Sequence, residues 1–455
     1  MTAKERIRQV LGVSLVIVGI FSIQPYTTWP IGNTFTWWFI NGFLLIAFAI
    51  ERRNSNSPLF DKKSKWMNFF IWYMVFSSIR GLFVAETYWD YKGLVGNIIS
   101  ILTPLVAFLV TNPPLFQKVL RNFMRFGLPL FLIIAAIITR DAYGFYLSPI
   151  AFFLLFFAAL SARWKWLVFV ISIFVLVADQ SARSNIIKFA FPLLLIFVYY
   201  FRQVLSIKFL KTFSLILFAA PIVFFSLAVT ETFNVFKMDE YIKGDFIKVA
   251  QNEEGDLVEE DLKSDTRTSL YAEVLGTAKE YNSWIVGRSP ARGNSTVLFS
   301  SLSEITGREE RLGNEVGILN IFTWTGLVGV FLFFMVCMSA SMLAINHSNN
   351  VFSKMLGIYI AFRWAYAWVE DPNYFNIMMW MLWFMIGMAY SPFFRGLTNA
   401  QYKLWIMGIF NRKSRLKFSN LVSNRMKVLA MLSSSRSSNR TSERIEEIPI
   451  HNKIQ

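Results

Sequence analysis

Long, uninterrupted apolar runs are the feature that most constrains what this chain can fold into. The runs are about 15–20 residues long, and roughly 20 residues of α-helix are needed to cross the hydrocarbon core of a bilayer. Backbone groups in hydrocarbon must be hydrogen-bonded within the protein, so only helices or closed β-barrels span it. Barrel strands are shorter and alternate apolar with polar residues. The sequence therefore predicts an all-α polytopic membrane protein.

Composition agrees with this fold class. Apolar residues make up 55% of the 455 residues and charged residues only 16%, which is less charge than a soluble domain of this size carries. The chain has 47 Phe and 15 Trp, a usage typical of lipid-facing helices and of aromatic belts at membrane interfaces. One cysteine, Cys337, and two histidines, His347 and His451, offer no basis for a disulfide within the chain or for a thiolate or histidine metal centre.

We expect about twelve spans, the first of which is retained, because Val10 to Ile23 is not followed by a small-residue signal cleavage site. The predicted spans cover residues 9–24, 35–50, 66–85, 93–111, 126–139, 143–160, 166–180, 185–201, 212–230, 315–345, 351–369 and 374–391.

Lysine and arginine are distributed unequally between alternate loops, and cytoplasmic loops carry the excess in membrane proteins. With the N-terminus inside, seventeen lie on the inner side and three in the short outer loops. The sequence therefore predicts that both termini are cytoplasmic. The inner residues are Lys4, Arg6, Arg8, Arg52, Arg53, Lys62, Lys63, Lys65, Lys118, Arg121, Arg125, Arg163, Lys165, Arg202, Lys208, Lys211 and Lys354, and the outer ones are Lys92, Arg140 and Arg183.

Four regions follow from this topology: spans 1–9 in residues 1–230, a large outer loop in 231–314, spans 10–12 in 315–391 and a basic inner tail in 392–455. The first part of the loop is acidic, with Asn252-Glu-Glu-Gly255 and Glu259-Glu-Asp261, and is expected to be solvated. Its second part predicts an amphipathic helix from Arg267 to Tyr281, because Leu270, Val274 and Ala278 recur at spacing four. The tail is expected to bind anionic inner-leaflet lipid and to be disordered over residues 433–442.

Arginines gather on the predicted outer face. Arg183 lies in a short polar hinge between two apolar runs, where a guanidinium needs a partner or must extend to the head groups. In the large loop, Arg267 starts the predicted helix, and Arg288 and Arg292 lie in a glycine-rich stretch. The planar fork of arginine suits phosphate oxygens, so these side chains are candidates for an anion clamp. Nearby acids leave ordinary salt bridges as the alternative, also for Arg311.

Carboxylates stand where spans meet the outer face. Glu315 lies at the mouth of span 10, either as a base that accepts a proton or as a first-turn acid beside a capping Asn314. Glu370 and Asp371 end span 11, two helical turns after Arg363, which predicts an internal ion pair or a direct role in the site. The same two interpretations apply to Arg80 in span 3. No phosphate-binding glycine loop, Asp-x-Asp pair or hydrolase elbow lies in an exposed loop, which argues against an ATP-driven pump and against a metal-dependent transferase.

Three segments, in order, resemble the bacterial O-antigen ligase and polymerase superfamily of Wzy- and WaaL-type proteins. Glu315 replaces the histidine that ligase-type members carry at the re-entry into the membrane, and this departure favours a polymerase-type member. The segments are Gln180-Ser-Ala-Arg-Ser184, then Arg267-Thr-Ser-Leu-Tyr271 running to Trp284-Ile-Val-Gly287, and finally Glu315 to Gly329, in which Leu319, Gly326, Leu327 and Gly329 match.

The resemblance implies a GT-C-like glycosyltransferase on the periplasmic face of the bacterial inner membrane, with no metal and no cofactor. Donor and acceptor would be undecaprenyl-diphosphate-linked oligosaccharides, with a chain-length regulator and a flippase as candidate partners and no nucleic acid. Glu315 would be the base. The diphosphate would bind Arg183, Arg267, Arg288 and Arg292, with support from Arg80, Arg311, Arg363, Glu370 and Asp371.

Two other functions remain open at this point. An O-antigen ligase would transfer the glycan to a lipid A-core or other acceptor. A transporter or flippase of lipid-linked sugars would be expected to have internal repeats and broken spans in matching halves, and the sequence has no convincing repeat.

Overall fold

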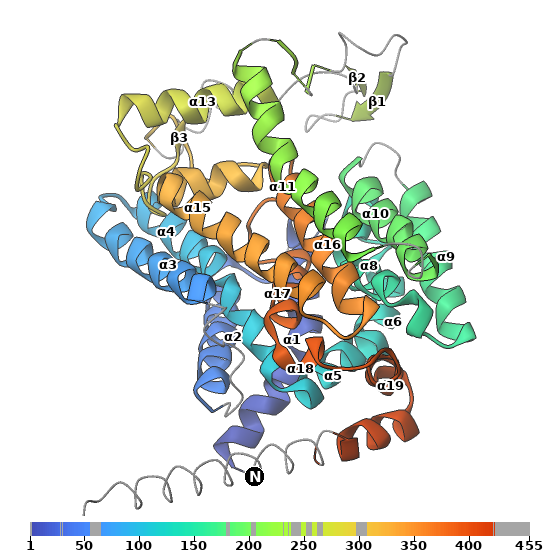
Figure 1. Cartoon of the computed structure of the whole chain (residues 1–455). Coiled ribbons are helices and arrows are strands. Elements are labelled where there is room, and N and C mark those ends of the chain that lie inside the picture. The colour runs from blue at the N-terminus through green and yellow to red at the C-terminus, as the bar shows by residue number, and fades with distance from the viewer. Residues whose placement is uncertain are drawn as a thin grey trace, which may run out of the picture.

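The computed structural model of the chain describes residues 2–27, 29, 31–54, 65–178, 183–201, 206–230, 232–234, 236–237, 247–251, 257–261, 267–296, 307–421 and 423. In this part the protein is built almost entirely from helices, with two small antiparallel sheets near one end (Figure 1). The predicted acidic segment 252–255 and the predicted disordered tail segment 433–442 lie outside the described residues.

The α-helices are α1 (Ala3–Ile23), α2 (Thr34–Asn54), α3 (Lys65–Val84), α4 (Tyr88–Ile101), α5 (Pro113–Asn122), α6 (Leu128–Ile134), α7 (Tyr143–Tyr146), α8 (Ser148–Leu155), α9 (Ala162–Ala178), α10 (Arg183–Tyr200), α11 (Ile207–Val229), α13 (Arg267–Glu280), α15 (Gly317–Asn346), α16 (Val351–Tyr366), α17 (Ile377–Tyr390), α18 (Pro392–Arg395) and α19 (Asn399–Phe410). A long 3₁₀ segment, η3 (Thr103–Thr111), follows α4. The sheets pair β1 (Ile247–Gln251) with β2 (Leu257–Asp261), and β3 (Asn294–Ser295) with β4 (Glu310–Arg311).

Six helical segments of the described part are long and apolar enough to cross a membrane, and two shorter apolar helices accompany them. These segments agree with an all-α, multi-pass membrane protein. The predicted number of about twelve spans is not confirmed. The six are Lys4–Tyr26, Thr34–Arg52, Lys65–Val84, Tyr88–Thr111, Ile207–Val229 and Gly317–Asn346, and the shorter two are Ser184–Tyr200 and Ile377–Tyr390.

The predicted spans 126–139 and 143–160 are not continuous helices. Residues Phe123–Gly127 form a π-helical turn, and α6, α7 and α8 have only 7, 4 and 8 residues. Pro129 and Pro149 lie in the first turns of α6 and α8. Proline is tolerated at the start of a helix but removes a hydrogen bond from its interior, so these apolar runs divide into short pieces.

Large apolar side chains remain exposed on the outer helices. Phe39, Phe83 and Leu132 are 77%, 84% and 79% exposed. Soluble proteins seldom leave wide apolar surfaces open to water, whereas lipid tails would cover these side chains at no cost. Their exposure is therefore a second sign of a membrane environment.

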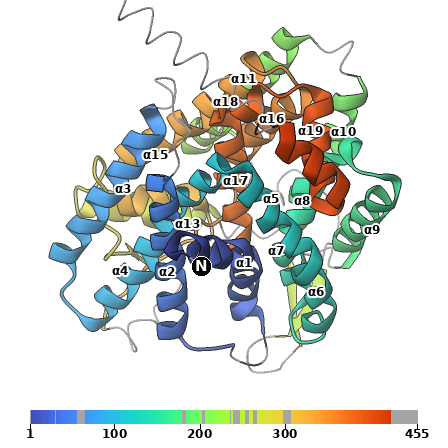
Figure 2. The same ribbon diagram turned by 90° about the horizontal axis from the view of Figure 1, so that it is seen from below.

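Helix α17 forms the centre of the molecule. All of its 14 residues are buried, and it packs against η3, α15, α16 and α8. Figure 2 shows it in the middle of the surrounding helices when the bundle is seen from the end that carries the N-terminus. A helix that is apolar on every side is stable only when neighbours enclose it, and this explains its high content of Met, Trp and Ile.

The large loop and the N-terminus lie at opposite ends of the bundle. In Figure 1, α13 and the β1–β2 hairpin lie at the top, while the N-terminus and α19 lie at the lower end. The amphipathic helix predicted from Arg267 to Tyr281 is confirmed as α13, and the predicted apolar positions Leu270, Val274 and Ala278 are buried.

Single-cysteine labelling will test the orientation. Lys279 on α13 and Lys417 after α19 are both exposed, and the native Cys337 is buried. In a Cys337→Ser background we expect a membrane-impermeant maleimide to label Lys279→Cys in intact spheroplasts, and Lys417→Cys only after lysis. Labelling of Lys417→Cys from outside would contradict the N-in, C-in topology.

Candidate functional site

Two glycines with positive φ lie where the large loop packs against α15. Gly326 interrupts α15 with φ 66° and ψ −167°, and Gly287 has φ 70°. A Cβ atom at Gly326 would lie 2.3 Å from the Ile285 carbonyl oxygen. Only glycine combines such dihedral angles with so close a backbone approach. The turn ending in Gly287 and the start of the Gly-Leu-x-Gly segment, two of the stretches that carry the resemblance, therefore contact each other.

The backbone groups that this kink frees are satisfied by neighbouring segments. The N–H of Leu327 donates to the Trp284 carbonyl at 2.8 Å, and the N–H of Arg288 donates to the Thr323 carbonyl at 2.7 Å. Arg80 on α3 donates from Nη2 to the carbonyls of Gly287 and Trp324 at 3.0 and 3.3 Å. In this arrangement Arg80 supports the kink.

The start of α15 also meets the end of α16. The N–H groups of Gly317 and Ile318 donate to the carbonyls of Glu370 and Ala367 at 3.1 and 2.9 Å. A Cβ atom at Gly317 would lie 2.3 Å from the Asp371 carbonyl oxygen, so glycine permits this approach. The first amides of a helix lack partners within it, and here the segment after α16 supplies them. Glu315 and Glu370 are thereby brought into neighbouring segments.

Glu370 is the centre of a charged group that we call the Glu370 cluster: Lys188, Arg267, Tyr366 and Glu370. The Oε2 atom of Glu370 lies 3.7 Å from Arg267 Nη2 and accepts a hydrogen bond from the Tyr366 hydroxyl at 3.3 Å. Its Oε1 atom lies 3.8 Å from Lys188 Nζ. Arg267 also donates from Nε to the Val369 carbonyl at 3.1 Å. Two cations thus flank one carboxylate.

Lys188 was not among the predicted site residues. It lies on α10, with 5% of its side chain exposed, donates to Ser184 Oγ at 2.5 Å and stacks over the rings of Phe145 and Tyr366. A lysine inside an apolar run is itself a functional signal, because such a charge is costly in hydrocarbon unless it has a partner. That signal was present in the predicted span 185–201.

The predicted internal ion pair of Arg363 forms with Asp371. Arg363 Nε and Nη2 contact Asp371 Oδ2 at 3.0 and 2.5 Å, and both side chains are almost fully buried. The predicted spacing of two helical turns pointed to Glu370, but α16 ends at Tyr366. The chain then turns, Asp371 takes φ 73°, and its carboxylate faces back toward the helix.

Glu315 precedes α15 and does not belong to its first turn. The helix begins at Gly317 after Val316, without a side-chain cap, so the predicted capping role of Asn314 is wrong. Asn314 exchanges hydrogen bonds with Asn320 instead. Glu315 accepts a hydrogen bond from Arg311 Nη2 at 3.2 Å and keeps 55% of its side chain exposed. This carboxylate is accessible to a ligand.

Arg288 and Arg292 converge on Glu310. Arg292 contacts both carboxylate oxygens, at 3.0 Å from Nε and 2.5 Å from Nη2, and Arg288 Nη2 lies 3.1 Å away. Burial alone would raise the pKa of Glu310, but the hydrogen bond from Arg292 and the two positive charges hold it below the ordinary value. This geometry favours the salt-bridge interpretation of the two arginines. For Arg183, the first residue of α10, the structure describes the backbone alone.

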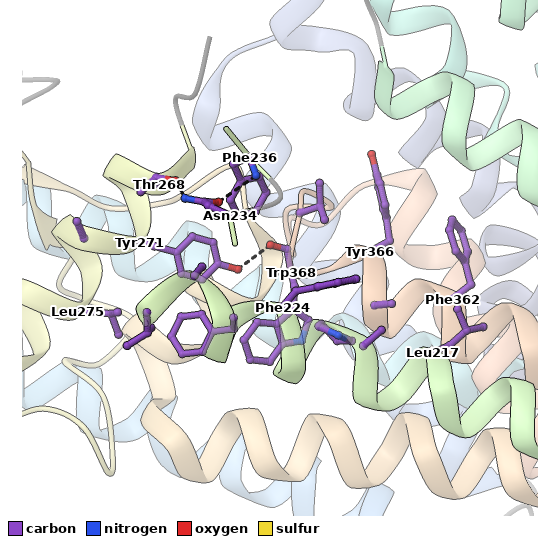
Figure 3. Close-up of a pocket in the computed structure, with 18 residues that line it drawn as sticks. Leu217, Phe224, Asn234, Phe236, Thr268, Tyr271, Leu275, Phe362, Tyr366 and Trp368 are labelled. Atoms are coloured by element: carbon purple, nitrogen blue, oxygen red, sulfur yellow. Dashed lines mark hydrogen bonds between the residues drawn. The ribbon is translucent and has the colours of Figure 1, made fainter. Parts of the chain in front are cut away.

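An apolar groove reaches the Glu370 cluster from one side. It has a volume of about 470 Å³ and is lined by α11, α13, α16 and the residues after α16. Figure 3 shows the rings of Phe224, Tyr271 and Trp368 around it, with the Tyr271 hydroxyl donating to the Trp368 carbonyl at 2.6 Å. Val369, whose carbonyl accepts from Arg267, also lines the groove. The apolar groove therefore lies next to the guanidinium group of Arg267.

A second hollow, which we call the aromatic cavity, lies between α1, α2, α4 and residues 372–376. It has a volume of about 860 Å³, and Glu315 is part of its wall. Because residues 368–369 line the groove and residues 372–376 line the cavity, the segment after α16 borders both hollows. Rings and amides line the cavity in addition to Glu315, among them Tyr26, Trp37, Trp38, Asn41, Trp89 and Asn97.

No protein-family model matches the chain, and no curated protein matches it. The family resemblance accordingly stays a prediction from the sequence. Among the residues that the structure describes, no group of three or more His, Cys, Asp or Glu side chains is arranged to hold a metal ion. What the described site offers is cationic side chains, an accessible carboxylate and two adjoining hollows.

Proposed function

We propose that the chain polymerises undecaprenyl-diphosphate-linked oligosaccharide repeat units into a surface polysaccharide, on the periplasmic face of a bacterial inner membrane. The observation that carries this proposal is the junction of the apolar groove with the Glu370 cluster, beside a cavity that holds Glu315. A lipid-linked diphosphate has an apolar chain, an anionic head and a sugar, and the three parts of the site suit these in turn.

In this proposal the prenyl chain lies in the apolar groove and the diphosphate lies against Arg267 and Lys188. Hydrogen bonds between a guanidinium and phosphate oxygens are about twice as strong as neutral ones. In the structure the carboxylate oxygens of Glu370 lie 3.7 Å from Arg267 Nη2 and 3.8 Å from Lys188 Nζ. These distances are longer than direct hydrogen bonds. An incoming diphosphate would therefore gain close contacts that the resting ion pairs do not make.

The reaction transfers a glycosyl group. The bond between the anomeric carbon of the donor and its phosphate oxygen breaks, and a bond from an acceptor hydroxyl oxygen to that carbon forms. Glu315 takes the hydroxyl proton as a general base. The lipid diphosphate leaves with the bonding electron pair, and Arg267 and Lys188 stabilise the negative charge that develops on it.

Replacing Arg267 will test the donor site. We expect Arg267→Ala to reduce chain extension about tenfold to a hundredfold, because losing one charge-assisted contact costs about 1.5–3 kcal/mol. Lys279→Ala removes an exposed cation from the same helix and should leave polymer length unchanged. The measurement is the length distribution of the surface polysaccharide, with the amount of protein in the membrane as the folding control.

A deletion strain separates the proposed polymerase from its alternatives. Loss of the chain should leave single repeat units on the lipid carrier and on the cell surface. A ligase defect would instead leave long polymer on the carrier, and a flippase defect would leave unpolymerised units inside. Normal polymer length in both the deletion strain and Arg267→Ala would refute the proposal.

A further inference from the structure

The aromatic cavity contains a buried amide oxygen without a partner. Asn41 on α2 is 1% exposed and lines the cavity, and its Oδ1 atom has no hydrogen-bond partner among the described residues. Buried polar atoms in proteins are nearly always satisfied, and leaving one unpaired is unfavourable by about 1–3 kcal/mol. An acceptor in this position is explained if a ligand with a hydroxyl group binds there.

The surrounding side chains suit a ligand with one apolar face and a polar edge. Trp38 and Trp89 are half-buried at the cavity wall, and part of each indole is exposed. Lys92, which also lines the cavity, places its Nζ atom 4.5 Å from the centroid of the Trp89 ring, so a sugar would stack on the part of Trp89 that Lys92 leaves open. The face of an aromatic ring carries partial negative charge and attracts C–H groups, which carry partial positive charge. A pyranose ring has such C–H groups on its faces and hydroxyls around its rim. The cavity volume of about 860 Å³ lies within the usual range for small-molecule sites.

The position of Glu315 decides which sugar the cavity would hold. Glu315 is part of the cavity wall, whereas Arg267 donates to the carbonyl of Val369, which lines the apolar groove. A general base must reach the hydroxyl that attacks, so the sugar beside Glu315 is the one that is glycosylated. The donor diphosphate belongs to the groove side.

We infer that the aromatic cavity is the subsite for the terminal sugars of the acceptor glycan, an assignment that rests on the proposed function. Trp38 and Trp89 stack against the faces of the sugar rings, and Asn41 accepts a hydrogen bond from a hydroxyl. The subsite orients the attacking hydroxyl toward Glu315, and its shape selects the repeat unit that is extended.

Direct binding to a glycan will test the subsite without requiring turnover. The probe is a set of oligosaccharides of one to three repeat units, released from the surface polysaccharide of the strain that carries this chain. Binding to the detergent-purified full chain is measured by calorimetry and by saturation-transfer NMR. We expect Trp38→Ala and Trp89→Ala each to weaken binding about threefold to tenfold, and Asn41→Leu about fivefold.

Two controls separate a lost subsite from a misfolded protein. Trp72→Ala removes a ring that is 67% exposed on α3 and does not line the cavity, so binding should be unchanged. Trp38→Phe keeps an aromatic face and should retain most of the affinity. Each variant is also compared with the wild type by thermal unfolding in the same detergent.

Failure of the subsite and failure of the proposed function give different results. The subsite would be overturned if the wild type did not bind glycan, or if all three cavity variants bound glycan as tightly as the wild type. If the cavity variants bind weakly while Arg267→Ala and the deletion strain still make polymer of normal length, the cavity is a glycan-binding site, but the proposed polymerase activity and the acceptor role that rests on it are refuted.

Discussion

Glu315→Gln is expected to lower the rate of chain extension about 10²–10⁴-fold, the usual contribution of a general base. The amide keeps the size of the side chain and can still accept a hydrogen bond from Arg311, which now lies 3.2 Å from the carboxylate. It cannot take up a proton from the acceptor hydroxyl. The measurement is the initial rate of polymer formation by purified protein with lipid-linked oligosaccharide.

Stability should change little in the same variant. The Glu315 side chain is 55% exposed and that of its partner Arg311 is 15% exposed, and ion pairs with a carboxylate open to water contribute about 0–1 kcal/mol. Glu309→Gln removes an exposed acid from the same loop and provides the matched control, with no expected loss of rate. A fully active and well-folded Glu315→Gln would show that the proton goes elsewhere.

Arg363→Met is expected to destabilise the protein by about 3–5 kcal/mol, the range for breaking one side of a buried ion pair. The Arg363 and Asp371 side chains are 2% and 1% exposed, so the carboxylate would be left without its partner in a nearly water-free environment. Methionine keeps the apolar length of the arginine stem. Thermal unfolding in detergent, followed by light scattering, gives the change.

A double variant distinguishes the charge effect from loss of packing. Arg363→Met with Asp371→Asn removes both charges, and asparagine tolerates the left-handed backbone that Asp371 adopts. We expect it to recover much of the lost stability. If the double variant is as unstable as Arg363→Met alone, packing around the guanidinium matters more than the unpaired carboxylate.

Local patterns in the sequence predicted the parts of this protein that depend on neighbouring residues. The spacing of Leu270, Val274 and Ala278 gave α13 to within one residue of its end. Continuous apolar runs predicted helices that are confirmed as α1, α2, α3, α11 and α15, with boundaries shifted by a few residues. Gly287 and Gly326 belong to the segments that carry the family resemblance, and both have positive φ in the fold.

The sequence could not predict which charged residues form ion pairs across the bundle. The predicted spacing assigned Glu370 to Arg363, but the turn after Tyr366 brings Asp371 to it and gives Glu370 to Lys188 and Arg267. Likewise, Arg288 and Arg292 are separated from Glu310 by about twenty residues, and the β3–β4 pairing brings these segments together. An ion pair depends on a separation of a few ångströms, which sequence distance does not report.

The amino-acid sequence is enough to assign the class of protein, because backbone in hydrocarbon must be hydrogen-bonded within the protein and the apolar runs are long enough to require helices. It also determined where charge is concentrated along the chain. Three features are visible only in the folded protein. The start of α15 donates backbone hydrogen bonds to the segment after α16, Lys188 and Arg267 both lie beside Glu370, and two hollows border one segment. These features arise from contacts between residues far apart in the chain, and close packing of many helices at once selects them.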